Sequence, residues 1–147
     1  MAKFIYRMQN VLDVKLKMED QARSAFAEAM AVLNEEEAKL EAIISRREFY
    51  EMEGRRLREN ILDPREMRDN TFAIDNLKEQ EKAQEMNVAA ARNALERVRM
   101  NLQIAIQERK TQEKLKENAF EDFKHELNAQ ESKEVDELVS YRFGNSG

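Results

Sequence analysis

The only histidine of the chain, His125, is the side chain best suited to acid–base or metal chemistry, and it stands three residues after Asp122. This spacing puts both side chains on one face of a helix, but helical metal sites combine several such pairs from facing helices. Here the pair occurs once, cysteine is absent, and the three glycines are too scattered for a phosphate-binding loop. We therefore expect no catalytic residue, no metal and no cofactor, and we predict that the chain is not an enzyme.

Two clusters of charge are the next candidates for a site. Residues 35–37 are three glutamates, and residues 92–116 carry seven basic and three acidic side chains. Charge runs on helices are most often solvated faces, and a net charge of −5 with a pI near 5.2 gives no reason to propose a nucleic-acid partner. We predict that neither cluster is catalytic and that the chain binds no nucleic acid.

The composition indicates long helices. One proline and three glycines in 147 residues cannot punctuate a multi-element globular fold, and 37% charged residues are typical of coiled coils. Nowhere are there about 20 consecutive apolar residues, and the first 15 residues lack the apolar core of a signal peptide. We expect a cytoplasmic protein that reaches a membrane only through its partners.

Apolar residues recur at heptad spacing in both halves of the chain, as in the seam of a coiled coil. In the first half, Lys15, Glu19 and Glu36 interrupt two such series. The apolar members of these series are Ile5, Leu12, Phe26, Leu33 and Leu40, and Met8, Ala22, Ala29, Ile43, Tyr50 and Leu57. The pattern predicts an all-α fold, a long two-helix antiparallel coiled-coil hairpin that forms a single domain.

The break between the arms falls around Pro64, which suits the first turn of a helix with Asp63 as its N-cap. A cap at residues 69–71 is the alternative. We predict a first arm over about 3–60, a turn within about 60–70 and a second arm over about 71–143. If residue i faces roughly residue 130 − i, the second arm overhangs from about residue 128, and the basic segment 1–25 lies partly along the acidic segment 117–137.

Two further features stay open at this stage. The wholly polar stretch 107–114 marks either a local unwinding of the coiled coil or a hinge. Phe49, Tyr50 and Phe72 gather near the turn, where they either plug the end of the hairpin or form a partner-binding patch.

Both termini resemble those of the flagellar export protein FliJ family. The resemblance covers essentially the whole chain but rests on short motifs. These are Phe4-x-Tyr6-Arg7-Met8-x-x-Val11-Leu12-Asp13-x-Lys15 followed by Glu19, and Lys133-Glu134-Val135-Asp136-Glu137-Leu138 followed by Tyr141-Arg142-Phe143.

The resemblance implies a non-catalytic stalk or adaptor of the flagellar type III export apparatus, serving flagellum biogenesis, motility and chemotaxis. Such a protein is similar to the γ subunit of F-type ATP synthases. It binds the ring of the export ATPase FliI, promotes ring assembly, couples the ring to the export gate protein FlhA and escorts export chaperones. Its place is the cytoplasmic face of the inner membrane, and we expect a monomeric hairpin when it is alone.

The same resemblance assigns residues to these contacts. It implies an ATPase-ring contact at Phe4, Tyr6, Arg7, Leu12, Asp136, Glu137 and Tyr141. It implies, on a looser match, an export-gate contact at Tyr50, Phe72 and Leu77. The alternatives are a general coiled-coil chaperone, which the adaptable methionines favour, and a structural linker in an unrelated complex. For the methionines themselves, the competing interpretation is packing in or beside the seam.

Overall fold

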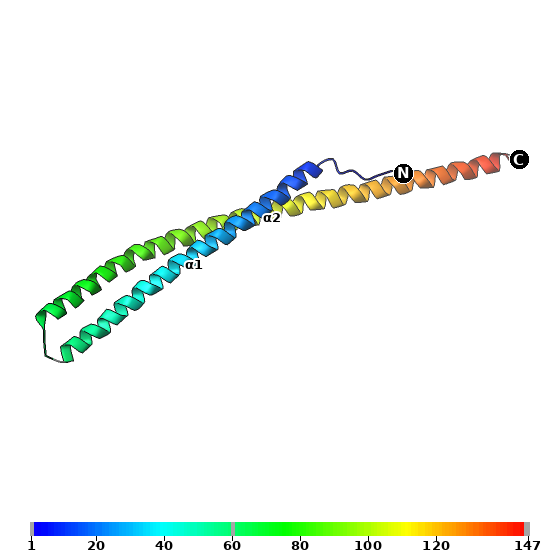
Figure 1. Ribbon diagram of the computed structural model, residues 1–147. Helices are drawn as coiled ribbons and strands as arrows, with labels where there is room; N and C mark the ends of the chain where they lie inside the picture. The colour runs from blue at the N-terminus through cyan, green and yellow to red at the C-terminus, as the bar shows by residue number, and fades with distance from the viewer. Residues whose placement is uncertain (1, 60, 146–147) are drawn as a thin grey trace. The chain divides into compact units, whose positions relative to one another are not determined.

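A computed structural model describes residues 2–59 and 61–145 of the chain. It contains two helices, α1 (Gln9–Glu59) and α2 (Pro64–Asn145), which pack against each other in antiparallel fashion (Figure 1). The predicted all-α, two-helix hairpin is confirmed. The polar stretch 107–114 stays within α2 without a break, so the hinge that we considered there is absent.

The helix α1 begins later than the apolar periodicity indicates. Residues 2–6 are not helical, and the first turn forms as the N–H of Leu12 donates to the carbonyl of Met8 at 3.1 Å. The expected start near residue 3 is therefore wrong by about six residues. The reason is a tertiary contact, since the ring of Phe4 packs on Phe120 and Phe123 of α2 instead of continuing the helical stripe.

The helix α2 begins at Pro64, the earlier of the two starts that we considered. The carboxylate of Asp63 accepts a hydrogen bond of 3.0 Å from the N–H of Arg65, and its backbone carbonyl accepts one of 3.1 Å from Met67. Asp63 is thus an N-cap, and Pro64 sits at N1, where its missing N–H costs nothing. The connection ends at residue 63 and not near residue 70. Asn60, where we expected the first arm to end, lies outside the described residues.

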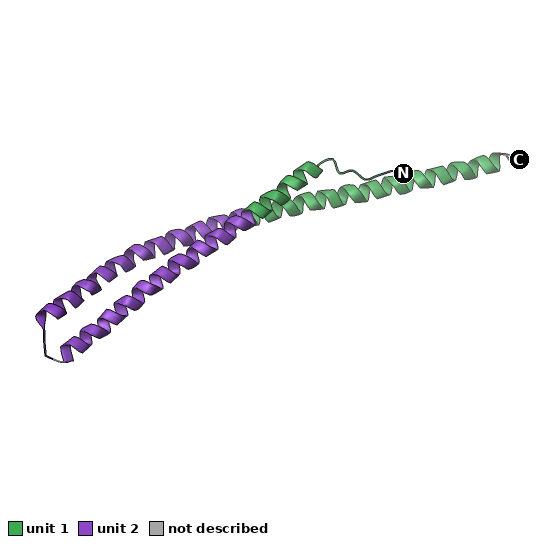
Figure 2. Cartoon of the chain, in the orientation of Figure 1, with its two compact units in different colours: residues 1–21, 103–147 green, residues 22–102 purple. Residues whose placement is uncertain are grey.

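The chain divides into two compact units, and both helices contribute to each (Figure 2). Unit 1 comprises residues 1–21 and 103–147, and unit 2 comprises residues 22–102. Unit 2 holds a cluster of buried apolar side chains, formed by Leu33, Val88 and Ala91 with Leu40 and Leu95 packed against it. Leu33 and Leu40 belong to one of the predicted seam series, so the seam is placed correctly there.

Polar residues that interrupt the seam of unit 2 meet polar partners across it. The Nε2 atom of Gln84, which is 7% exposed, donates to the backbone carbonyl of Glu36 at 2.8 Å and to its Oε2 at 2.5 Å. Arg47 donates from Nε to Oε2 of Glu81 at 2.9 Å. Polar pairs inside an apolar seam specify register, because a slip would place a charge against an apolar side chain.

Unit 1 uses the same device. Glu19, an interruption in the predicted series, is 6% exposed and is paired with Arg109. Lys15, another interruption, reaches Oε2 of Glu108 at 3.0 Å. These partners precede residue 117, so the expected pairing with segment 117–137 does not hold for Lys15 and Glu19. It holds at the start of the chain, where Phe4 packs on Phe120 and Phe123. The turn is centred closer to residue 62 than to residue 65. A residue of α1 therefore faces a residue of α2 with a lower number than we expected.

Candidate partner-binding surfaces

The N-terminal strap, residues 2–8, lies on α2 within unit 1. The Phe4 ring is edge-on to Phe120 with centroids 5.2 Å apart, and tilted to Phe123 at 5.5 Å. The hydroxyl of Tyr6 donates to Oε1 of Gln112 at 3.3 Å. Ile5 stays 77% exposed. The strap is thus anchored by the ring of Phe4 and the hydroxyl of Tyr6, and it presents the aliphatic side chain of Ile5 to solvent.

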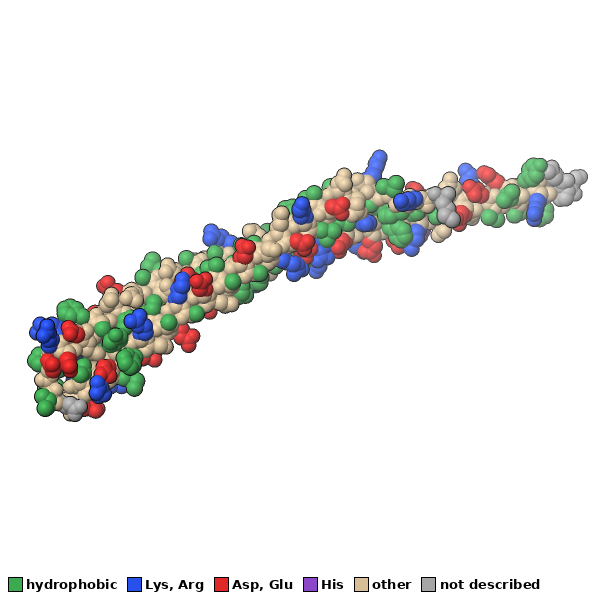
Figure 3. Space-filling view, in the orientation of Figure 1, with side chains coloured by type: hydrophobic (Ala, Val, Ile, Leu, Met, Phe, Trp, Pro, Cys, Tyr) green, Lys and Arg blue, Asp and Glu red, His purple; other side chains and the backbone are tan. Residues whose placement is uncertain are grey.

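The overhang, residues 128–144 of α2, is exposed at every position, so no part of the described α1 covers it. Val135, Leu138 and Val139 are 57%, 65% and 45% exposed. Their spacing of i, i+3 and i+4 places them on one helix face, the pattern of a helix that docks into a groove. Figure 3 shows hydrophobic side chains among charged ones at this end of α2.

The structure separates the residues predicted to contact an ATPase ring. Leu12 is 4% exposed and lies in the seam, so it supports the surface without forming part of it. Arg7, Asp136 and Glu137 are exposed, and Tyr141 is 70% exposed. Asp136 follows Phe123 by 13 residues, roughly 20 Å of helix at the usual rise. The N-terminal residues predicted to contact the ring therefore lie beside an earlier part of α2, whereas the C-terminal ones lie further along this helix. The two groups are not in contact.

The turn surface of unit 2 consists of five large apolar side chains near the connection. They are 60–98% exposed: Phe49, Met52, Ile61, Leu62 and Phe72. The plug that we considered for the aromatic residues is wrong for Phe49 and Phe72, at 62% and 66% exposure. Hydrophobic side chains are visible at this end in Figure 3. The patch interpretation is the one the geometry supports.

The residues predicted to contact an export gate divide between surface and seam. Phe72 lies on the turn surface, whereas Tyr50 is half-buried with its ring edge-on to Phe49 at 5.6 Å. Leu77 is 4% exposed and packs in the seam, so it offers no contact area. Sequence reasoning missed Ile61 and Leu62, which are 98% and 60% exposed; Ile61 is the most accessible of the five. The sequence signal that could have revealed them is the presence of two adjacent aliphatic residues in a predicted turn, where polar residues are usual.

A close approach of the helices supports the turn surface. The Nδ2 atom of Asn70 donates to the backbone carbonyl of Tyr50 at 2.8 Å, and a Cβ at Gly54 would lie 2.5 Å from Oδ1 of Asn70. Beside it lies a cleft of about 420 Å³, lined in part by Tyr50, Asn70, Glu53 and Arg56. The hydrogen bond from Arg56 lowers the pKa of the Glu53 carboxyl.

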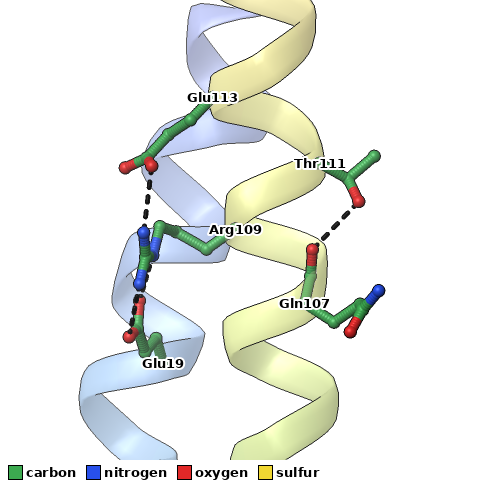
Figure 4. A network of polar contacts seen from close by, with 5 residues as sticks. All are labelled: Glu19, Gln107, Arg109, Thr111 and Glu113. Atoms are coloured by element: carbon green, nitrogen blue, oxygen red, sulfur yellow. Dashed lines mark hydrogen bonds and ion pairs between the residues drawn. The ribbon is translucent and has the colours of Figure 1, made fainter.

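The side chain of Arg109 bridges two glutamates in unit 1 (Figure 4). Its Nε and Nη2 atoms donate to the two carboxylate oxygens of Glu19 at 2.7 and 3.2 Å, and Nη1 donates to Glu113 at 2.9 Å. These hydrogen bonds, first to Glu19 and then to Glu113, raise the pKa of Arg109 above its ordinary value. In unit 2, hydrogen bonds to Glu51 and then Glu81 raise the pKa of Arg47 in the same way.

Within residues 2–59 and 61–145, no group of three or more His, Cys, Asp or Glu side chains is placed to hold a metal ion. His125 is exposed on α2. In the same described part of the chain, neither helix is long and apolar enough to cross a membrane. The features that stand out are the strap, the overhang and the turn surface.

Two antiparallel helices with exposed apolar surfaces define an all-α protein suited to binding other proteins. The chain matches the model of the Flagellar FliJ protein family over residues 4–147 and belongs to that family. It is therefore a component of the flagellar export apparatus, from a non-enzymatic family whose members interact with other proteins of that apparatus. Neither the curated proteins nor the solved structures contain a match to this chain.

Proposed function

We propose that the chain is a stalk that binds the ring of the export ATPase FliI through unit 1 and the export gate protein FlhA through the turn surface. In this role it promotes ring assembly and couples the ring to the gate at the cytoplasmic face of the inner membrane. The observation that carries the proposal is the overhang, a helical segment with three apolar side chains on one face and no described residue of α1 against it.

The overhang favours a protein groove as its binding site. The overhang carries Glu131, Glu134, Asp136 and Glu137 against Lys133 and Arg142, so its charge is net negative and a groove with a basic rim is complementary to it. Anchors at i, i+3 and i+4 are the recognition mode of an amphipathic helix in a groove. The strap adds Ile5 and Arg7, both exposed, to the same unit.

The test measures ATP hydrolysis by the export ATPase of the same organism with and without the full chain. We expect stimulation with ring formation, and we expect L138S/Y141S to lose most of it. Both side chains are at least 65% exposed, so the variant keeps its fold. Met86→Ser, at 74% exposure in unit 2, is the matched control and keeps full stimulation. If L138S/Y141S stimulates like the control, the overhang is not the ring contact.

Gate coupling has its own test at the turn surface. We expect I61S/F72S to weaken binding to FlhA at least tenfold, because central apolar anchors dominate interface energies. The same variant should stimulate the ATPase normally, since both residues lie in unit 2. Loss of both activities at once would point to misfolding and would remove this assignment.

A second candidate function, chaperoning of exported proteins, is favoured by the methionines. We expected most of them in or beside the seam, yet six are 38–74% exposed: Met8, Met18, Met30, Met52, Met86 and Met100. Flexible thioether side chains suit promiscuous surfaces. If this function holds, the chain suppresses aggregation of unrelated unfolded proteins at near-stoichiometric amounts. If aggregation is not suppressed, the chaperone function is excluded and the stalk function remains.

A further inference from the structure

The seams of the two units differ in what holds them. Among the described residues of unit 1, two apolar side chains are buried, Leu12 and Ala105, and the third buried residue is Glu19. The opposing stretch of α2, residues 107–114, is wholly polar. Unit 2 buries the apolar side chains of Leu33, Leu77, Val88 and Ala91, with Gln84 as its buried polar residue. While the preceding strap is held by the packing of Phe4 on Phe120 and Phe123, polar contacts therefore make up a larger share of the seam along residues 9–21 of α1 than in unit 2.

Those contacts converge on one ion pair. Figure 4 shows the guanidinium of Arg109 between the carboxylates of Glu19 and Glu113, one on each helix. Lys15 with Glu108 at 3.0 Å and Tyr6 with Gln112 at 3.3 Å flank it. A bidentate Arg–carboxylate pair is geometrically specific, so it closes in one register only.

A polar seam opens more readily than an apolar one. When arms separate, Glu19 and Arg109 recover hydration that offsets much of their lost attraction. Separation of the unit 2 seam would instead expose apolar area to water, and this exposure has an unfavourable free energy that hydration does not offset. Two solvent-open grooves of about 450 and 750 Å³ border Phe4 beside the strap.

We propose that unit 1 is a zipper that opens while the unit 2 seam stays closed, with the Glu19–Arg109 pair as its lock. Opening frees the segment 9–21 of α1 and the facing stretch of α2, so that a partner can bind either arm. The use of the open state in ring binding rests on the proposed function, whereas the opening itself is a property of the isolated chain.

The test measures distances between two spin labels by double electron–electron resonance in the full chain. The sequence has no cysteine, so labels attach only where cysteines are introduced. The labelled pair is Lys17 and Lys110, both exposed in unit 1. The control pair is Ser45 and Lys82, both exposed in unit 2 at the same register, since each pair of residue numbers adds to 127. We expect short and long distances at 17/110 and one narrow distance at 45/82.

Substitution of the lock should shift these populations in opposite directions. R109L removes the two hydrogen bonds that join the buried carboxylate of Glu19 to α2, so the ratio of long to short distances at 17/110 rises roughly tenfold. E19L/R109L replaces the ion pair by an apolar pair, which is often stabilising, and the long distance disappears. The pair 45/82 stays unchanged in both variants. Circular dichroism checks that helix content is kept, and the double variant retains the test if R109L fails to fold.

Two results would overturn the zipper. One is a single narrow distance at 17/110 that R109L does not widen. The other is equal broadening at 17/110 and 45/82, which would be general loosening. The functional arm adds the export ATPase: the closed variant E19L/R109L should stimulate it less than the wild type. If not even the wild type stimulates it, the proposed function fails while the distance result stands.

Discussion

The side-chain amide of Asn70 donates a hydrogen bond of 2.8 Å to the backbone carbonyl of Tyr50, across the helix pair beside the turn. Gly54 makes this approach possible, because a Cβ there would lie 2.5 Å from Oδ1 of Asn70. The contact ties the first turns of α2 to the last turns of α1. It thereby supports the turn surface that Phe49 and Phe72 form.

Gly54 and Asn70 should be energetically coupled. Alanine is favoured over glycine in a helix by up to about 1 kcal/mol, so G54A in the N70A background should raise the free energy of unfolding by about that amount. In the wild-type background the new Cβ displaces the Asn70 amide, and the same change should be neutral or destabilising. Urea unfolding of the four proteins of the cycle measures the coupling. Equal effects of G54A in both backgrounds would contradict it.

The fold follows from local sequence features to a large extent. Leu33 and Leu40 reveal the seam by their spacing, and Asp63 with Pro64 reveals the start of α2, because caps and heptads are local signals. The start of α1 at Gln9 could not be predicted from local sequence. The conformation of the strap depends on the packing of Phe4 against Phe120 and Phe123, more than 100 residues away.

The candidate surfaces were predicted less completely. Phe72 and Tyr141 were named and are exposed, but Leu12 and Leu77 were also named and are buried. Both leucines occupy heptad positions, and in a two-helix seam only the register and the local packing decide which apolar residues face inward. The Gly54 contact with Asn70 joins residues from different helices, so no local pattern announces it.

The seam cluster of unit 2 should carry much of its stability. Leu33 is 8% exposed and packs with Val88 and Ala91. L33A should therefore lower the free energy of unfolding by about 2 kcal/mol. This is the low end of the range for leucine-to-alanine changes, because a narrow two-helix seam can partly close around the gap. Met86→Ala, at 74% exposure, should change it by less than about 0.5 kcal/mol. Urea denaturation followed by circular dichroism compares the two. Similar losses in both would mean that the seam is not the core.

The Glu53 carboxyl should titrate below its ordinary range. Arg56 donates a hydrogen bond of 3.1 Å from Nε to Oε1 of Glu53, which lowers the pKa of that carboxyl. Because the folded pKa lies below the unfolded one, the stabilisation is present above the unfolded pKa. It is lost as pH falls through the folded pKa. Side-chain carbon shifts of Glu53 against pH should show this midpoint, and R56Q should move it upward. An unmoved midpoint would exclude the hydrogen bond as the cause.

The buried amide of Gln84 should set register at the expense of stability. Q84L replaces a polar group by an apolar one at a position that is 7% exposed. The side chain of Glu36, which is 21% exposed, can turn to water once its partner is gone. The free energy of unfolding should therefore rise by about 1 kcal/mol. The same change removes a polar constraint on register, and association into dimers should become detectable by sedimentation. Q84E keeps the size but places a second carboxylate against Glu36, which should lower stability at pH 7 and recover it on acidification. A less stable, strictly monomeric Q84L would show that Gln84 holds the helices together and does not select their register.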